Sequence, residues 1–110
     1  MFQMSLNRVH DTVKVNEGNE SIVLKVNGDP SRIIAGLNRV QKTLQDITEE
    51  TPDEERKGAA RSLAAVIFGD EQAEKLMEFY RDDALCVISI CGSYFKDRLS
   101  KLITKAQKRQ

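Results

Sequence analysis

The residues of this chain that could perform chemistry are few, and their spacing suits none of the common reactions. The chain has one histidine and two cysteines. Nucleophilic catalysis requires a serine, cysteine or threonine held beside a base. His10, the only histidine, lies at the margin of a predicted strand. We therefore expect no catalytic role for His10 and no enzymatic activity.

The two cysteines, Cys86 and Cys91, are expected to be thiols that pack in the interior. They are five positions apart, so on a helix they would project about 140° from each other and could not form a disulfide. The spacing also differs from the CxxC of metal and redox motifs. With a single histidine in addition, the sequence predicts no zinc site.

The remaining cluster of carboxylate side chains is the acidic run TEETPDEE (48–55). Its glutamates are contiguous and lack the turn glycine of a calcium loop. They suit instead the positive end of a helix dipole. The segment NGDPS (27–31) lacks the second glycine and the lysine-serine pair of a phosphate loop. We predict no catalytic, metal or cofactor-binding residues, and no cofactor.

Composition restricts the class of protein further. The 110 residues predict a single domain spanning 1–110, and 17 basic residues balance 17 acidic ones. A net charge of zero does not favour nucleic acid or an acidic membrane as partner. The apolar run 84–95 is too short to span a membrane. The N-terminus MFQMSLNRVHD has no signal-peptide pattern, so we expect a cytoplasmic protein.

Alternating apolar residues predict a β-hairpin over about residues 10–27, before any helix. Val13 and Val15 alternate with polar residues, and Leu24 and Val26 do the same in a second run. Between these runs, NEGNE supplies residues that tolerate positive φ, so a short loop is predicted around 17–19. An isolated hairpin is only marginally stable, so its apolar face must pack on other elements.

Four helices are predicted after the hairpin, at about 30–48, 52–68, 70–81 and 83–106. Asp29 is placed to cap the first, and Pro30 has the φ favoured at a first helical position. Gly69 is expected to end the second helix and Asp70 to cap the third. The predicted fold class is α+β, with an N-terminal hairpin packed on a small bundle of about four helices.

The order of these elements, together with two short segments, resembles a known family. The segments are VLKVNGDP (23–30), at the start of the first predicted helix, and VIFGDE (66–71), at the corner between the second and third. They resemble the tail assembly chaperones of long-tailed, siphovirus-type bacteriophages and prophages, many of which have a similar FGE corner. The resemblance covers most of residues 12–105.

The resemblance implies a protein that binds the phage tape-measure protein and presents it to tail-tube subunits in the bacterial host cytoplasm. In many members, a ribosomal frameshift adds a second domain. Two other classes stay open. One is a structural tail-completion or head-tail joining protein. The other is a small DNA-binding regulator, which the acidic first turn of EQAEKLMEFYRDD (71–83) disfavours, because DNA phosphates would lie there.

The last predicted helix has apolar residues on two faces. One stripe contains Leu85, Ile88 and Phe95, and we expect it to face the core. The second face either makes this helix a central, buried one or forms an exposed contact surface. Our hypothesis is that the second face binds the client protein or a second copy of the chain. The candidate partner-binding residues are Val87, Ile90, Tyr94, Leu99, Leu102 and Ile103.

Overall fold

A two-stranded antiparallel hairpin opens the fold. The computed structural model describes residues 8–108, in which β1 (Val9–Glu17) pairs with β2 (Glu20–Gly28) over the full length of both strands. Gly18 has a φ of 60° at the first loop position, as two-residue type II′ hairpin turns require. The predicted hairpin is confirmed, and each strand is one residue longer at its outer end.

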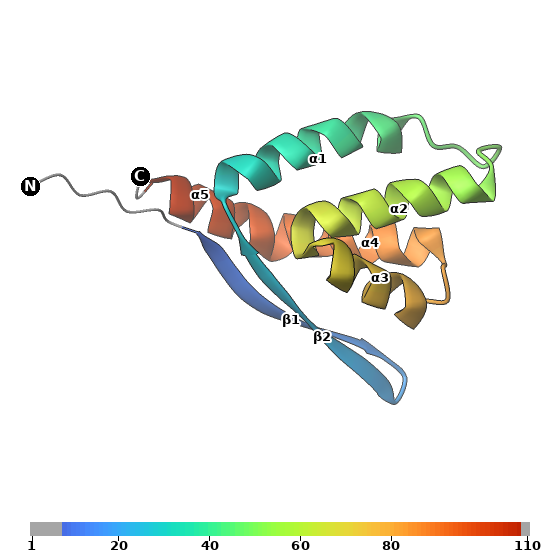
Figure 1. Cartoon of the computed structure of the whole chain (residues 1–110), viewed down its shortest axis with the longest axis horizontal. Helices are drawn as coiled ribbons and strands as arrows, with labels where there is room; N and C mark the ends of the chain where they lie inside the picture. Colours follow the sequence, from blue (N-terminus) through green and yellow to red (C-terminus); the bar gives the residue numbers. More distant parts are fainter. Residues whose placement is uncertain (1–7, 109–110) are drawn as a thin grey trace, which may run out of the picture.

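The hairpin has one buried and one exposed face, because successive side chains of a strand alternate. Val9, Val15, Leu24 and Val26 are buried against the helices. The opposite face carries exposed residues such as Lys14. In Figure 1 the hairpin runs diagonally past the helices, and its loop end extends beyond them.

Four helical regions follow, which confirms the predicted α+β class. They are α1 (Pro30–Gln45), α2 (Asp53–Phe68), α3 (Asp70–Phe79) and a long final helix made of α4 (Ala84–Tyr94), η1 (Phe95–Leu99) and α5 (Ser100–Lys108). The first helix ends three residues before the predicted Thr48. The Thr48 backbone N–H instead donates to Thr51 Oγ1 at 2.8 Å, which forms a turn before α2. Within residues 8–108, no helix combines the length and hydropathy of a membrane span.

The helix caps agree with the prediction at α1 and differ at α3. Asp29 Oδ1 accepts a hydrogen bond from the Ser31 backbone N–H at 2.9 Å, so Asp29 caps α1 as predicted. Asp70 is not the cap of α3. Gly69, with a φ of 91°, occupies the cap position and Asp70 is the first helical residue. One glycine therefore both ends α2 and starts α3, which makes the corner one residue tighter than predicted.

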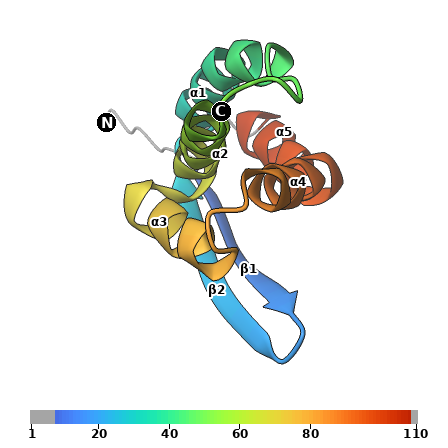
Figure 2. The ribbon, with the colours of Figure 1, turned by 90° about the vertical axis from the view of Figure 1, so that its right-hand side faces the viewer.

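Helix α2 is the centre of the bundle, because it packs against α1, α3, α4 and β2. Its small residues Ala60 and Ala64 are fully buried, which lets neighbouring elements approach α2 closely. At Gly36, α1 approaches α2 so closely that a Cβ atom there would lie 2.7 Å from a Val66 methyl carbon. Figure 2 shows α1, α3 and α4 arranged around α2, with the hairpin below them.

Candidate partner-binding surface

The inner face of α4 belongs to the core. Val87 and Cys91 are fully buried, with 0% exposed surface. Burial raises the pKa of the Cys91 thiol to about 12, so this cysteine stays protonated and unreactive near neutral pH. The part of the second face that contains Val87 is therefore buried within the monomer. For this part, the alternative of a central, buried helix is the one observed.

The other cysteine is also a free thiol. Cys86 is half-buried near the start of α4, and its hydrogen bond with Asp83 is the main factor that raises its pKa. Asp83 Oδ1 also accepts a hydrogen bond from the Cys86 backbone N–H at 3.2 Å and so caps α4. Within residues 8–108, no group of three or more His, Cys, Asp or Glu residues is arranged to hold a metal ion.

Tyr94 connects α4 to two other elements. Its ring stacks on Phe68 of α2, with ring centroids 5.8 Å apart. Its hydroxyl donates a hydrogen bond to Asp11 Oδ2 of β1 at 2.7 Å. Burial and the nearby Asp11 carboxylate raise the pKa of Tyr94, so the hydroxyl keeps the proton that it donates. Tyr94 is thus half-buried and positions the hairpin against the helices.

Arg98 completes this connection with a two-pronged ion pair to Asp11. The Arg98 Nε–Oδ2 distance is 2.6 Å and the Nη2–Oδ1 distance is 3.0 Å. The side chain of Asp11 is only 7% exposed, whereas that of Arg98 is 62% exposed. The hydrogen bond from Arg98 lowers the pKa of Asp11 despite the opposing effect of burial. We call Asp11, Tyr94 and Arg98 the hairpin clamp.

The hairpin clamp was not predicted from the sequence, although a signal for Asp11 was present. Asp11 has the same strand phase as Val13 and Val15, so it lies on the face that alternation directs toward the core. A carboxylate at such a position requires a hydrogen-bonding or charged partner. The identity of that partner depends on the fold, because Arg98 is far away in sequence.

The π-helical segment η1 explains why the buried residues before it and after it do not form one continuous α-helical stripe in the sequence. A π turn holds about one residue more than an α turn, which turns the following residues by about 100°. Leu99 and Ile103 would face the same side as Leu85 and Ile88 in an uninterrupted α-helix. After η1 they instead follow the face of Val87, and both are buried.

The apolar stripe that we predicted to face the core therefore lies on the outside along α4 and at Phe95, the first residue of η1. Leu85 is 61% exposed, Phe95 is 38% exposed, and Ile88 is half-buried. Gly92 lies between them on the same side, and a Cβ atom there would meet open space. We call Leu85, Ile88, Gly92 and Phe95 the outer stripe. The prediction that this stripe is buried is wrong at Leu85 and Phe95.

The six predicted partner-binding residues fall into two groups. Val87, Leu99 and Ile103 are buried in the core, so the prediction that they offer surface to a partner is wrong. The physical reasons are the packing of α4 on α2 and the change of phase at η1. Ile90, Tyr94 and Leu102 are half-buried and pack at the edge of the core. Ile88 of the outer stripe packs at the edge of the core in the same way, so the exposed large apolar side chains of this helix are Leu85 and Phe95.

Comparisons with known proteins add no constraint on the function. Neither a protein-family model, nor a curated protein sequence, nor a solved structure matches the chain.

Proposed function

We propose that this protein is a non-enzymatic tail assembly chaperone of a siphovirus-type bacteriophage or prophage. It acts in the cytoplasm of the bacterial host, where it binds the tape-measure protein and brings it to the tail-tube protein. The outer stripe is the surface that binds the client. The resemblance of residues 23–30 and 66–71 to this family supports the class, and the exposed stripe supports the mode of binding.

The observation that carries the proposal is the spacing of the outer stripe. Its members are separated by three, four and three residues, which is the spacing of contacts along one side of a helix. From Leu85 to Phe95 the stripe extends about 15 Å, or nearly three turns. An amphipathic client helix offers apolar residues with the same spacing. Gly92, which has no side chain, allows the client backbone to approach closely at the middle of the stripe.

Co-expression with the tape-measure protein tests the proposal. The tagged chain should capture the product of the tape-measure gene encoded beside it, and a Leu85→Asp/Phe95→Ser variant should lose that capture. Val23→Asp is the matched control, because Val23 is a similarly exposed apolar residue on the outer face of the hairpin. Undiminished capture by a folded Leu85→Asp/Phe95→Ser variant would remove the outer stripe as the binding surface.

Mass spectrometry of purified phage particles separates this proposal from a structural tail protein. A chaperone should be absent from the finished particle, whereas a tail-completion or head-tail joining protein should be present in it. Detection of this chain in particles at a stoichiometric level relative to tail proteins would contradict the chaperone assignment.

A further inference from the structure

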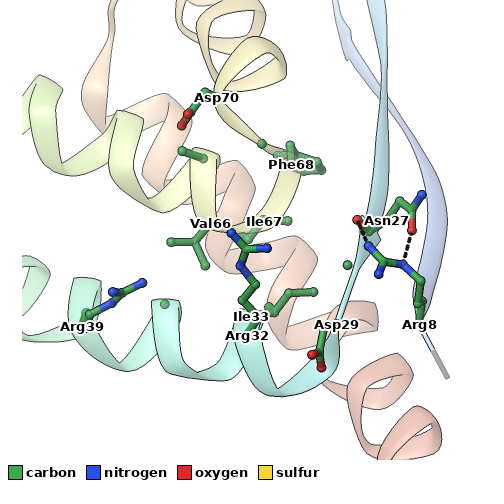
Figure 3. Close-up of a pocket in the computed structure, with 14 residues that line it drawn as sticks. Arg8, Asn27, Asp29, Arg32, Ile33, Arg39, Val66, Ile67, Phe68 and Asp70 are labelled. Carbon is green, nitrogen blue, oxygen red and sulfur yellow. Dashed lines mark hydrogen bonds between the residues drawn. The ribbon is translucent and has the colours of Figure 1, made fainter. Parts of the chain in front are cut away.

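A groove with three arginines lies between the start of α1 and the corner that joins α2 to α3. Its volume is about 600 Å³, and it shares no residue with the outer stripe. Arg32 and Arg39 border it from α1, and Arg8 borders it from the segment before β1. Figure 3 shows the three guanidinium groups along the groove, with Arg32 between the other two. We call this feature the arginine groove.

The three arginines have no carboxylate partner among the residues that the structure describes. The four ion pairs within 8–108 are formed by Arg56, Lys57, Arg61 and Arg98. Arg8 donates hydrogen bonds only to uncharged oxygens of Asn27, at 2.8 Å and 3.4 Å. The lining of the groove also contains two aspartates, so three arginines against two aspartates leave it with a net charge of +1.

The floor of the groove is apolar and comes from the close contact of two helices. Gly36 lies between Arg32 and Arg39 and packs directly against Val66 of α2. Ile33 and Ile67 are buried beside this contact. Because Gly36 has no side chain, α1 and α2 touch at the floor while the arginine side chains rise along its border. A ligand would therefore meet an apolar base and positive flanks.

We propose that the arginine groove binds an acidic, extended peptide segment of a partner protein. Arg32 and Arg39 are seven residues apart on α1, so their backbone positions differ by about 10 Å along the helix axis. An extended peptide rises about 3.3 Å per residue, so about three of its residues span this separation and its acidic side chains can reach both arginines. Arginine side chains can hold such carboxylates through two parallel hydrogen bonds.

Two carboxylates at the borders of the groove favour a peptide over nucleic acid. Asp29 and Asp70 lie on opposite borders of the groove. A nucleic acid carries a charge at every nucleotide and would place phosphates near both carboxylates. A peptide can place uncharged residues there and acidic residues at the arginines. The arginine groove is therefore a second contact surface of the protein, separate from the outer stripe.

Fluorescence polarisation with the full chain tests this inference. The probe is a labelled peptide in which glutamate alternates with glycine, and its glutamine counterpart is the uncharged reference. The wild-type chain should bind the glutamate peptide, more weakly at high salt. An Arg32→Gln/Arg39→Gln variant should bind it about tenfold more weakly or worse, since two charge-assisted contacts are lost. Lys14→Gln/Lys101→Gln, which makes the same change in net charge outside the groove, should bind like the wild type.

A second variant keeps the test valid if the first one misfolds. Arg32→Lys/Arg39→Lys keeps both charges but removes the planar fork, and it should show intermediate affinity. The inference is overturned if the wild-type chain does not bind the glutamate peptide, or if the folded glutamine variant binds it equally well. Tighter binding of single-stranded oligothymidylate than of the glutamate peptide would also overturn it and would indicate a phosphate-binding surface.

Discussion

The two sides of α4 have similar apolar residues but opposite environments. Val87 and Cys91 on the inner face are fully buried, whereas Leu85 and Phe95 of the outer stripe are exposed. A helix that is apolar all round does not itself specify which side enters the core. Features outside α4 therefore determine which of its sides is buried. They are the packing on α2, the hairpin clamp and the change of helical phase at η1.

The largest effect is expected from changing the phase of the final helix at η1. Insertion of one alanine after Lys96 adds a residue beyond the one that the π turn already absorbs, and should turn Leu99 and Ile103 away from the core by about 100°. The loss in the free energy of unfolding should exceed the roughly 2–5 kcal/mol expected for truncating one large core side chain. Urea denaturation followed by circular dichroism measures it. Lys96→Ala, which keeps the chain length, should behave like the wild type; equal stability of the insertion variant would contradict the phase given to Leu99 and Ile103.

The same substitution on each side of the final helix compares the two environments directly. Leu99→Ala should lower the free energy of unfolding by about 2–5 kcal/mol, because Leu99 is fully buried. Leu85→Ala should change it by less than about 0.5 kcal/mol, because Leu85 is mostly exposed. Both values come from urea denaturation. Comparable losses for the two variants would show that the outer stripe is also covered.

Removing the Tyr94 hydroxyl should have a smaller effect than Leu99→Ala. Tyr94→Phe keeps the stacking on Phe68 but removes the hydrogen bond to Asp11. We expect a loss of about 0.5–1.5 kcal/mol in the free energy of unfolding, as for a typical buried hydrogen bond. Tyr80→Phe is a suitable control, because Tyr80 is a half-buried tyrosine outside the hairpin clamp. If the two variants are equally stable, the clamp hydrogen bond does not stabilise the hairpin.

The hairpin clamp should also make stability depend on pH in the acidic range. Arg98 lowers the folded-state pKa of Asp11 below its ordinary value of 3.8. The ionised carboxylate therefore stabilises the fold above the unfolded-state pKa, and this contribution is lost as the pH falls through the lower folded-state value. Arg98→Met should lose less stability than the wild type on acidification from about pH 7 to about pH 3.

A control arginine separates this effect from general acid denaturation. Arg61 pairs with Glu74 at 3.0 Å, but both side chains are about half exposed. Exposed pairs of this kind contribute little to stability. Arg61→Met should therefore follow the acid profile of the wild type. An Arg98→Met profile that also matches the wild type would show that the Asp11 pair is not a source of acid sensitivity.

Much of the fold follows from local sequence patterns. Strand alternation predicts the hairpin, and Asp29-Pro30 and Gly69 predict the helix limits near them, because each acts within a few residues. The buried side of α4 could not be predicted in this way. Its phase depends on a π turn that no local pattern signalled and on the contact of Arg98 with Asp11, which lies 87 residues earlier.

Three of the six residues predicted to contact a partner, Val87, Leu99 and Ile103, are buried in the core. The arginine groove was also not predicted, since charged residues such as Arg32 and Arg39 are ordinary on the polar side of an amphipathic helix. Arg8 lies near them because it is hydrogen-bonded to Asn27 of β2, the strand that leads into α1. Such sites combine residues from separate elements and require the tertiary structure.

The outer stripe as client surface is tested most directly by methyl NMR of the leucine-labelled chain titrated with a helical fragment of the tape-measure protein. We expect the Leu85 methyl signals to shift or broaden with added fragment while those of the buried Leu24 and Leu99 stay unchanged. If Leu85 stays unchanged while the fragment binds elsewhere on the chain, the client surface does not lie on the outer side of α4.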